Sequence, residues 1–304
     1  MNKKHFKLFG ILAILLSLSS LTGCKLFQPK AKEFDVSNEL KITLTEDFVK
    51  SGTLDSTSSW STGVSLEEKN NTALVQVFRW KQSEFNGFER PNLTEFSKIA
   101  SSKNINYDIE NELCYTNEYE TSRIYVKSYF FKTDFAYYEI DFRYVSSEDS
   151  RIHNWAKSIK FTQDLIYDID QTMTNTKTIT LDQQDGATIN IGTSFVKVLD
   201  ETKYQKLRLD GTIYRSQLSI NISDKNDYDS LQEYALDLGY TNRNLTDKDY
   251  IALSGSGYFV GIGTADIYVY CFESEDHYYT LEFTSNELGI SQTFDSYADS
   301  FQSN

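Results

Sequence analysis

Alternation of apolar and polar positions recurs along the chain and predicts β-strands. In YYEIDFR, Tyr138, Ile140 and Phe142 alternate with charged residues, and YYTLEFT further on repeats the pattern. A period of two places successive side chains on opposite faces of a sheet. The other strands predicted in the first half are LKITLT, STGVSLEE, TALVQVFRW, ENELCYTNEY and SRIYVKSYFFK, and FAYYEIDFRY extends the first segment.

Two segments show helical periodicity behind a capping signal. In PNLTEFSKIA, Asn92 is followed three residues later by Glu95, and in DSLQEYALDL Ser230 is followed by Glu233. This spacing is typical of a capping box, in which two side chains satisfy the first free amides of a helix. Apolar residues at i, i+3 and i+7 then share one helical face. Short closing helices are predicted at NWAKSIKF and SYADSF.

These elements occur twice in the same order. EDFVK at the front of one series matches TSFVK at the front of the other, and four matched anchors are offset by 147, 138, 141 and 142 residues. Repetition at a nearly constant offset indicates two copies of one domain. We predict a first copy at 36–162, a linker at 163–176 and a second copy at 177–304.

The predicted fold class is α+β, because short connections favour antiparallel strands and each copy also holds helices. The strand RIYVKSYFF is apolar or aromatic on both faces. Such a strand needs cover on both sides. We therefore predict two tandem copies of an antiparallel-sheet domain flanked by helices, each a three-layer sandwich.

The series of elements resembles a known family. A helix of the L-x-E-F/Y kind, paired strands, an aromatic-x-I/L-x-F strand and the closing WAKSIKF are similar to the PsbP-like fold, which DcrB-type bacterial lipoproteins share. The resemblance covers nearly the whole chain after residue 35, once per copy, although SYADSF lacks the S-I-K-F ending. It implies a non-enzymatic accessory or assembly factor.

The N-terminus has the layout of a bacterial lipoprotein signal peptide. Three early lysines precede the apolar run LFGILAILLSL, which is too short for a permanent membrane span. The run ends in a sequence that resembles a lipobox, made of Leu21, Thr22, Gly23 and Cys24. The resemblance implies cleavage after residue 23 and a diacylglyceryl thioether on Cys24, with residues 24–35 as a lipid-anchored tether. Two acyl chains suffice for stable membrane attachment.

The expected location is the extracytoplasmic face of the cell membrane. An ordinary secreted protein with an incidental cysteine, or a buried N-terminal helix, are the alternatives. The net charge of −14 becomes −17 when the three lysines of the signal segment are removed. Nucleic-acid binding is not expected, because phosphate backbones attract basic surfaces.

The remaining cysteines, Cys114 and Cys271, leave two interpretations open. Two thiols in an exported protein could form a disulfide. Cys271, however, is in phase with Ile267 and Val269 of a predicted strand, where a small buried thiol fits well. We favour buried free thiols.

Candidate catalytic chemistry is sparse. Two histidines follow the signal segment, His153 before a closing helix and His277 in a turn, and neither has the spacing of a zinc site. Acidic residues cluster in DLIYDID, DQQDG and DKNDYD, which we interpret as solvated turns. A weak calcium site at Asp224, Asp227 and Asp229 is the alternative, although the EF-hand pattern is not met. The glycine-rich GSGYFVGIG is predicted to form a hairpin with a bulged strand. No enzyme activity, metal or cofactor is expected.

Aromatic stripes on the central strands are the remaining candidates for a binding surface. Tyr125, Tyr129, Tyr268 and Tyr270 could line a groove for a glycan or a peptide. More often such stripes are core under a helix.

The sequence therefore favours a membrane-anchored binding or assembly module with an envelope protein as its partner. The alternative is a solute-binding lipoprotein that delivers a small ligand to a transporter, although such proteins normally have parallel strands. An envelope hydrolase is disfavoured, since no nucleophile and base can be paired.

Overall fold

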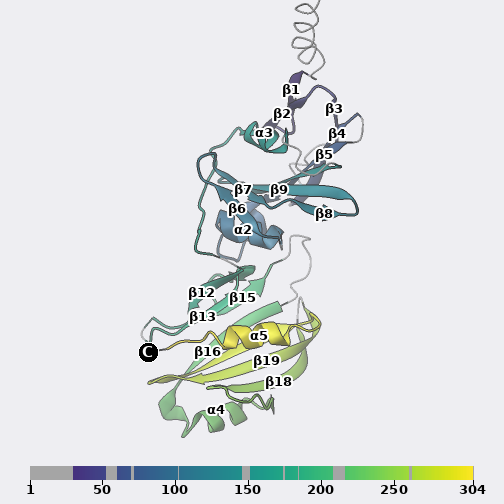
Figure 1. Ribbon diagram of the computed structural model, residues 1–304. Coiled ribbons are helices and arrows are strands. Elements are labelled where there is room, and N and C mark those ends of the chain that lie inside the picture. Colours follow the sequence, from purple (N-terminus) through teal and green to yellow (C-terminus); the bar gives the residue numbers. More distant parts are fainter. Residues whose placement is uncertain are drawn as a thin grey trace, which may run out of the picture.

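Antiparallel sheets and short helices make up both halves of the chain in the computed structural model (Figure 1). It describes residues 30–52, 60–69, 72–101, 103–145, 151–173, 175–183, 185–207, 216–259 and 262–303. The predicted signal peptide and the lipobox lie outside these residues. Within them, no helix is both long and apolar enough for a bilayer crossing.

The first half contains two sheets. Its elements are β1 (Ala31–Asp35), β2 (Leu40–Thr45), β3 (Phe48–Ser51), β4 (Trp60–Glu68), β5 (Ala73–Lys81), η1 (Gln82–Phe85), α2 (Leu93–Ala100), β6 (Ile105–Asp108), β7 (Leu113–Thr116), β8 (Tyr119–Thr121), β9 (Ile124–Lys132), β10 (Ala136–Tyr144), α3 (Arg151–Lys157) and β11 (Lys160–Phe161). The large sheet has the order β3-β4-β5-β10-β9-β7-β6, with β8 against β9, and the small one has the order β1-β2-β11.

The second half also contains two sheets. Its elements are β12 (Thr176–Thr180), β13 (Thr188–Gly192), β14 (Phe195–Lys197), β15 (Lys203–Lys206), β16 (Ser216–Asp224), η2 (Lys225–Asp227), α4 (Leu231–Asp237), β17 (Thr241–Asn242), β18 (Ile251–Phe259), β19 (Gly263–Glu273), β20 (His277–Ser285) and α5 (Ser291–Ala298). The large sheet has the order β14-β15-β16-β20-β19-β18-β17, and β12 pairs with β13. Position by position, this order corresponds to that of the first large sheet.

Aromatic side chains hold a helix against each face of the large sheets. In the first half, Phe96 of α2 stacks on Tyr137 at 4.6 Å, and Trp155 of α3 stacks on Phe142 at 6.3 Å. Tyr137 and Phe142 both belong to β10 but lie in separate core clusters. The β10 strand is therefore covered on both sides, which explains why its neighbour β9 is apolar on both faces.

The second half is packed in the same way. Tyr234 of α4 stacks on Tyr278 at 5.1 Å, and Phe294 of α5 stacks on Phe283 at 4.5 Å, in two separate clusters. Burial of large aromatic side chains on both faces removes apolar area from water and thereby stabilises such a sheet.

Both predicted helix starts are present, and they differ in detail. Asn92 and Glu95 form a full capping box at α2. At α4 the amide of Glu233 donates to Ser230 Oγ at 3.2 Å, but the Glu233 carboxylate accepts from the amide of Asp229. The Glu233 carboxylate therefore satisfies the amide of Asp229, one residue before the Ser230 amide that a capping box would satisfy.

Several strand predictions need correction. ENELCYTNEY is not one strand but two short ones, β7 and β8, and the sequence pattern missed β1, β3, β6 and β11. The helix predicted at NWAKSIKF ends at Lys157, and its last two residues form β11. The glycine-rich segment forms the predicted hairpin between β18 and β19, but its register runs without a shift from Ile251 opposite Cys271 to Phe259 opposite Gly263. The predicted bulge is therefore wrong.

The segment that follows the first half, which we call the strap (163–173), lies against that half. The amide of Ile166 donates to the carbonyl oxygen of Lys132 at 2.8 Å. The Asp168 carboxylate accepts from the amide of Leu93 at 2.7 Å and pairs with the Lys132 ammonium. The Asp170 amide donates to Thr94 Oγ1 at 2.8 Å. The predicted solvated turn is thus wrong for Asp168, whose carboxylate lies at the start of α2. The Asp170 carboxylate accepts from the amide and hydroxyl of Thr172, as in a local turn.

The two halves contact each other through the β14–β15 hairpin. Phe88 forms an isolated antiparallel bridge with Val198, flanked by hydrogen bonds from the Glu89 amide to the Lys197 carbonyl oxygen (2.9 Å) and from the Leu199 amide to the Gly87 carbonyl oxygen (2.8 Å). Gly87 has a φ of +86°, a conformation that glycine adopts without strain. Val196 and Leu207 complete the core cluster around Phe88.

Candidate functional site

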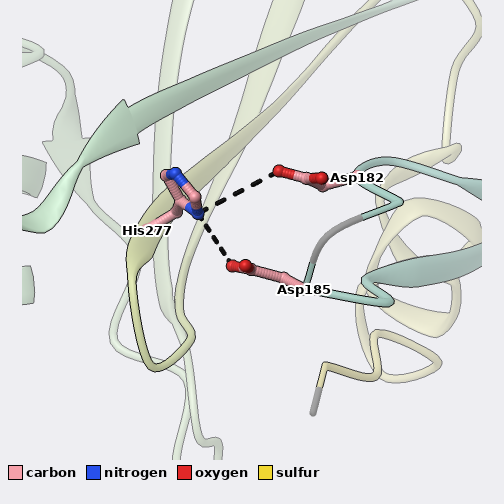
Figure 2. Close-up of side chains that lie close together, drawn as sticks. All are labelled: Asp182, Asp185 and His277. Atoms are coloured by element: carbon pink, nitrogen blue, oxygen red, sulfur yellow. Dashed lines mark hydrogen bonds and ion pairs between the residues drawn. The ribbon is translucent and has the colours of Figure 1, made fainter.

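Three polar side chains from distant parts of the second half meet beside β20 (Figure 2). Asp182 and Asp185 come from the turn between β12 and β13, and His277 is the first residue of β20. His277 Nδ1 lies 2.8 Å from Asp185 Oδ2 and 4.0 Å from Asp182 Oδ2. The His277 side chain is 25% exposed and that of Asp185 is 7% exposed. We call these residues the Asp182–Asp185–His277 cluster. The position of His277 in the sequence did not predict it.

Two further donors fix the Asp185 carboxylate. Ser274 Oγ donates to Asp185 Oδ2 at 2.6 Å and the Tyr279 hydroxyl donates to the same oxygen at 2.9 Å. These hydrogen bonds, first that from Ser274 and then that from His277, lower the pKa of Asp185 to about 2. The hydrogen bond to Asp185 raises the pKa of His277. The charged forms of both groups are thus favoured together.

The first half has a related contact at the corresponding place. Tyr138 on β10 occupies the position of Tyr279 on β20, since each is opposite a phenylalanine of the next strand. Its hydroxyl donates to Glu39 Oε2 at 2.7 Å, and Arg79 Nη2 donates to Glu39 Oε1 at 2.6 Å. Glu39, like Asp185, lies in the turn of the small hairpin. A tyrosine–carboxylate pair therefore joins hairpin to sheet in both halves, but with different cations.

A hollow of about 530 Å³ opens near the end of the second half. Phe272 and Phe301 stack at 4.1 Å within it, and Tyr250 packs on Phe272 at 5.2 Å. Its lining residues are Asp247, Lys248, Asp249, Tyr250, Phe272, Glu273, Ala298, Asp299, Phe301, Gln302 and Ser303. Carboxylates outnumber ammonium groups in this lining. The hollow therefore suits a ligand with a positive charge and an apolar part.

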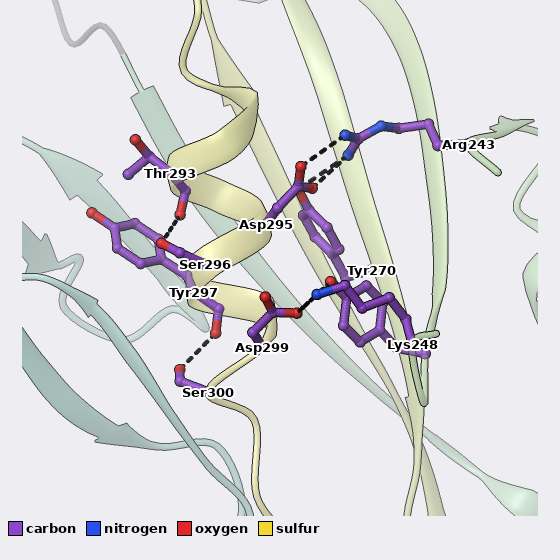
Figure 3. Close-up of polar contacts among 10 residues, drawn as sticks. Arg243, Lys248, Tyr270, Thr293, Asp295, Ser296, Tyr297, Asp299 and Ser300 are labelled. Atoms are coloured by element: carbon purple, nitrogen blue, oxygen red, sulfur yellow. Dashed lines mark hydrogen bonds and ion pairs between the residues drawn. The ribbon is translucent and has the colours of Figure 1, made fainter. Parts of the chain in front are cut away.

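A charged network ties α5 to the sheet next to this hollow (Figure 3). Arg243 Nη1 and Nη2 bind the two oxygens of Asp295 at 2.9 and 3.1 Å. The Tyr270 hydroxyl donates to Asp295 Oδ1 at 2.7 Å. Burial, and then the hydrogen bond to Asp295, raise the pKa of Tyr270, so it remains a donor. Lys248 pairs with Asp299 one helical turn further on.

We expect Asp295→Asn to destabilise the second half by about 2 kcal/mol, because hydrogen bonds to a charged partner contribute about 1.5–3 kcal/mol and an amide offers one acceptor in place of two. The matched control is Asp299→Asn, whose carboxylate is 44% exposed and should cost below about 1 kcal/mol. Urea unfolding followed by the near-ultraviolet circular dichroism of the tyrosines measures both. Equal effects for the two variants would contradict the role of the Arg243 pair.

The corresponding positions of the first half carry a weaker pair. The Tyr129 hydroxyl lies 3.5 Å from Nδ1 of His153 on α3, and His153 Nε2 lies 3.5 Å from Asp108 Oδ2. Burial lowers the pKa of His153. A tyrosine thus joins helix and sheet in both halves. The acidic group is Asp295 on helix α5 in the second half and Asp108 on strand β6 in the first.

The aromatic stripe predicted as core or groove is core. Tyr129 and Tyr270 are fully buried, and Tyr125 and Tyr268 are half-buried against the same clusters. Among the sequence candidates, Cys24 and the rest of the lipobox lie outside the described residues. Tyr129 lies under α3 and Tyr270 under α5, so neither can line a groove for a glycan or peptide. For the half-buried Tyr125 and Tyr268 the groove stays a prediction.

Both remaining cysteines are buried free thiols, the interpretation that the phase of Cys271 in its strand favoured. Burial raises the pKa of Cys114 and of Cys271 to about 12 in each case. The disulfide alternative is wrong. The two thiols lie in separate core clusters under α2 and α4.

Of the acidic segments, DKNDYD behaves as the predicted turn. Asp224 Oδ1 accepts from the amide and the side chain of Asn226 at 2.8 and 2.7 Å. DQQDG does not, because Asp185 is largely buried at His277. No sequence spacing signals that contact, since 92 residues separate the two side chains.

Comparisons with known proteins add little. No protein-family model and no curated protein matches the chain. Among solved structures, the chain is similar to the apo form of the immunity protein TplEi of T6SS from Pseudomonas aeruginosa, at 8% identity over 90% of this chain and 97% of that chain, with a TM-score of 0.19. A similarity at this TM-score supports no conclusion about fold or function.

Proposed function

We propose that the chain is a lipid-anchored lipoprotein on the extracytoplasmic face of the cell membrane, where it acts as a non-enzymatic binding or assembly module for an envelope protein. The lipobox-like end at Cys24 motivates the anchor. The tether was predicted at residues 24–35, but residues 31–35 form β1 of the first half, so residues 24–30 would be the tether. The negatively charged body would be repelled from an anionic membrane surface.

We further propose that the body consists of two tandem PsbP-like domains, the predicted copies at 36–162 and 177–304. The first also includes β1, and the second begins at Thr176 with β12. Three observations support this. The large sheets have corresponding strand orders, a tyrosine–carboxylate contact joins hairpin to sheet in each half, and Ser158 and Ser300 make matching contacts after the closing helices. Ser158 Oγ donates to the carbonyl oxygen of Trp155 at 2.7 Å, and Ser300 Oγ to that of Tyr297 at 2.6 Å.

The observation that carries the binding role is the connection between the halves. The strap is hydrogen-bonded to the first half. The bridge between Phe88 and Val198 joins the first half to the second. These contacts restrict the movement of the two halves relative to each other. A surface that does not reorganise on binding avoids part of the entropic cost of association.

The test is in-cell crosslinking of the tagged chain followed by mass spectrometry, with Cys24→Ser as the control. After membrane fractionation, we expect most of the Cys24→Ser variant in the soluble fraction, because the acyl chains attached to Cys24 supply the anchor. We also expect one dominant envelope protein to be crosslinked only in the anchored form. An unchanged membrane fraction would disprove the anchor, and the lack of any protein partner would disprove the assembly role.

The hollow beside α5 favours a second candidate, a solute-binding lipoprotein for a small cationic ligand. Its volume of about 530 Å³ is in the usual range for small-molecule sites. A thermal-shift screen that compares cationic with anionic solutes tests it. Stabilisation by cationic solutes alone, lost in Asp299→Asn, would support this candidate. The absence of any shift would remove it.

A further inference from the structure

We infer that Asp182, Asp185 and His277 form a binding site for a divalent transition-metal ion, with Zn²⁺ as the ion that fits best. Imidazole nitrogen and carboxylate oxygen are both ordinary zinc ligands. The site is independent of the partner surface proposed above.

The three ligand atoms are already close to the spacing that zinc requires. They lie within 4.8 Å of one another, and His277 Nδ1 is 2.8 and 4.0 Å from its two carboxylate neighbours. Bonds of about 2.0–2.2 Å in a tetrahedral site separate ligand atoms by about 3.4 Å. The two measured distances fall on either side of this value, so small side-chain rotations suffice. Figure 2 shows both carboxylates facing the same nitrogen of the His277 ring.

The charge of the cluster favours a divalent cation. Two carboxylates face one imidazole, and Asp276 adds a further negative charge next to His277. Lys225 carries a positive charge beside the turn between β19 and β20. Its ammonium binds Glu273 at 2.6 Å and the Ser274 carbonyl oxygen at 2.9 Å. When Zn²⁺ binds, the proton on Nδ1 leaves to solvent and the freed lone pair becomes a ligand.

The surroundings of the cluster orient the ligands. Ser274 Oγ and the Tyr279 hydroxyl hold the Asp185 carboxylate in place, as outer partners do at metal sites. The Asp182 side chain is 18% exposed and that of His277 is 25% exposed, so an ion can enter and retain water as the fourth ligand. This arrangement matches the three-protein-ligand sites of zinc.

The first half provides an internal comparison. There the hairpin carboxylate Glu39 meets Arg79, which is always protonated and has no lone pair to offer a metal. The second half has Ile222 opposite Tyr279, where the first has Arg79 opposite Tyr138. At the hairpin carboxylate, the permanently charged Arg79 of the first half thus has the His277 imidazole as its counterpart in the second half, and an imidazole can bind a metal. A bound ion would clamp the β12–β13 turn to β20.

The experiment is calorimetric titration of ZnCl₂ into the full chain, purified in detergent through a tag without histidine and freed of metal with EDTA. We expect saturable binding of a single ion per chain at neutral pH. His277→Ala should abolish it, and Asp182→Asn should weaken it at least about tenfold. Co²⁺ in place of Zn²⁺ should give the visible absorption of a tetrahedral site.

The matched control is His153→Ala, which removes the other described histidine, whose Nε2 lies 3.5 Å from Asp108 Oδ2. It should leave the stoichiometry and affinity unchanged. Asp182→Asn keeps the hydrogen bonds of Asp185, so it separates loss of metal from loss of folding. A flat titration of the parent chain would overturn the proposal. So would binding that survives both His277→Ala and Asp182→Asn, or that disappears in His153→Ala.

Discussion

Phe96→Ala is expected to lower the free energy of unfolding of the first half by about 4 kcal/mol. Truncation of a buried phenylalanine costs about 3–5 kcal/mol, as transfer energy is lost and a cavity remains. Phe96 is fully buried, and its ring lies 4.6 Å from Tyr137, 5.5 Å from Trp80 and 6.2 Å from Phe130. These rings come from α2 and three strands, so little can move to fill the gap.

The composition of the chain makes this measurement selective. All three tryptophans, Trp60, Trp80 and Trp155, belong to the first half, so tryptophan fluorescence during urea unfolding reports that half alone. The control is Phe135→Ala, whose side chain is 62% exposed and should change stability by less than about 0.5 kcal/mol. A loss below about 1 kcal/mol for Phe96→Ala would mean that α2 does not close this core.

Asp168→Ala is expected to destabilise the first half by about 3 kcal/mol and to release the strap. Removing one partner of a buried ion pair costs about 3–5 kcal/mol because the other charge is left behind. The Lys132 side chain is 9% exposed. Without Asp168 its ammonium loses its carboxylate partner and keeps the Pro91 carbonyl oxygen at 3.0 Å and the Tyr137 ring at 5.6 Å. The lower end of the range applies, because Asp168 itself is 36% exposed.

The measurement joins tryptophan-detected unfolding with limited proteolysis of the strap. We expect the variant to be cut in residues 163–173 well before the parent chain. Asp164→Ala is the control, since Asp164 is exposed in the same segment and should behave like the parent. If both variants resist the protease equally, the strap is held by its apolar contacts, such as those of Tyr167 and Ile169, and not by Asp168.

The parts of the fold that the sequence predicted correctly are those governed by local rules. The capping box at Asn92 and the alternation in β10 depend on residues a few positions apart, so they are visible in the sequence. The short strands β1 and β6 were missed because the first is exposed along most of its length and the second is only half-buried. Neither has an apolar face strong enough to signal a strand.

The candidate site could not be predicted from the sequence, because its contacts join residues that are far apart in the chain. Glu39 and Arg79 are 40 residues apart, and Asp185 and His277 are 92 residues apart. Their contacts arise because the small hairpin folds over the large sheet, which brings its turn to one tyrosine of the central strand. No spacing rule for metal ligands covers such pairs. Tyr129 and Tyr270, by contrast, were correctly favoured as core because a strand between two covered faces must be apolar on both.

The attachment of the strap has a consequence for the order of folding. Its polar contacts described above all go to the first half, to Leu93, Thr94 and Lys132. Since a chain is made from its N-terminus, domains tend to form in that direction. The first half can therefore close its sheet through β10 and accept the strap before the later residues have emerged. The strap then sets the point from which the second half grows, and this limits wrong pairing between strands of such similar pattern.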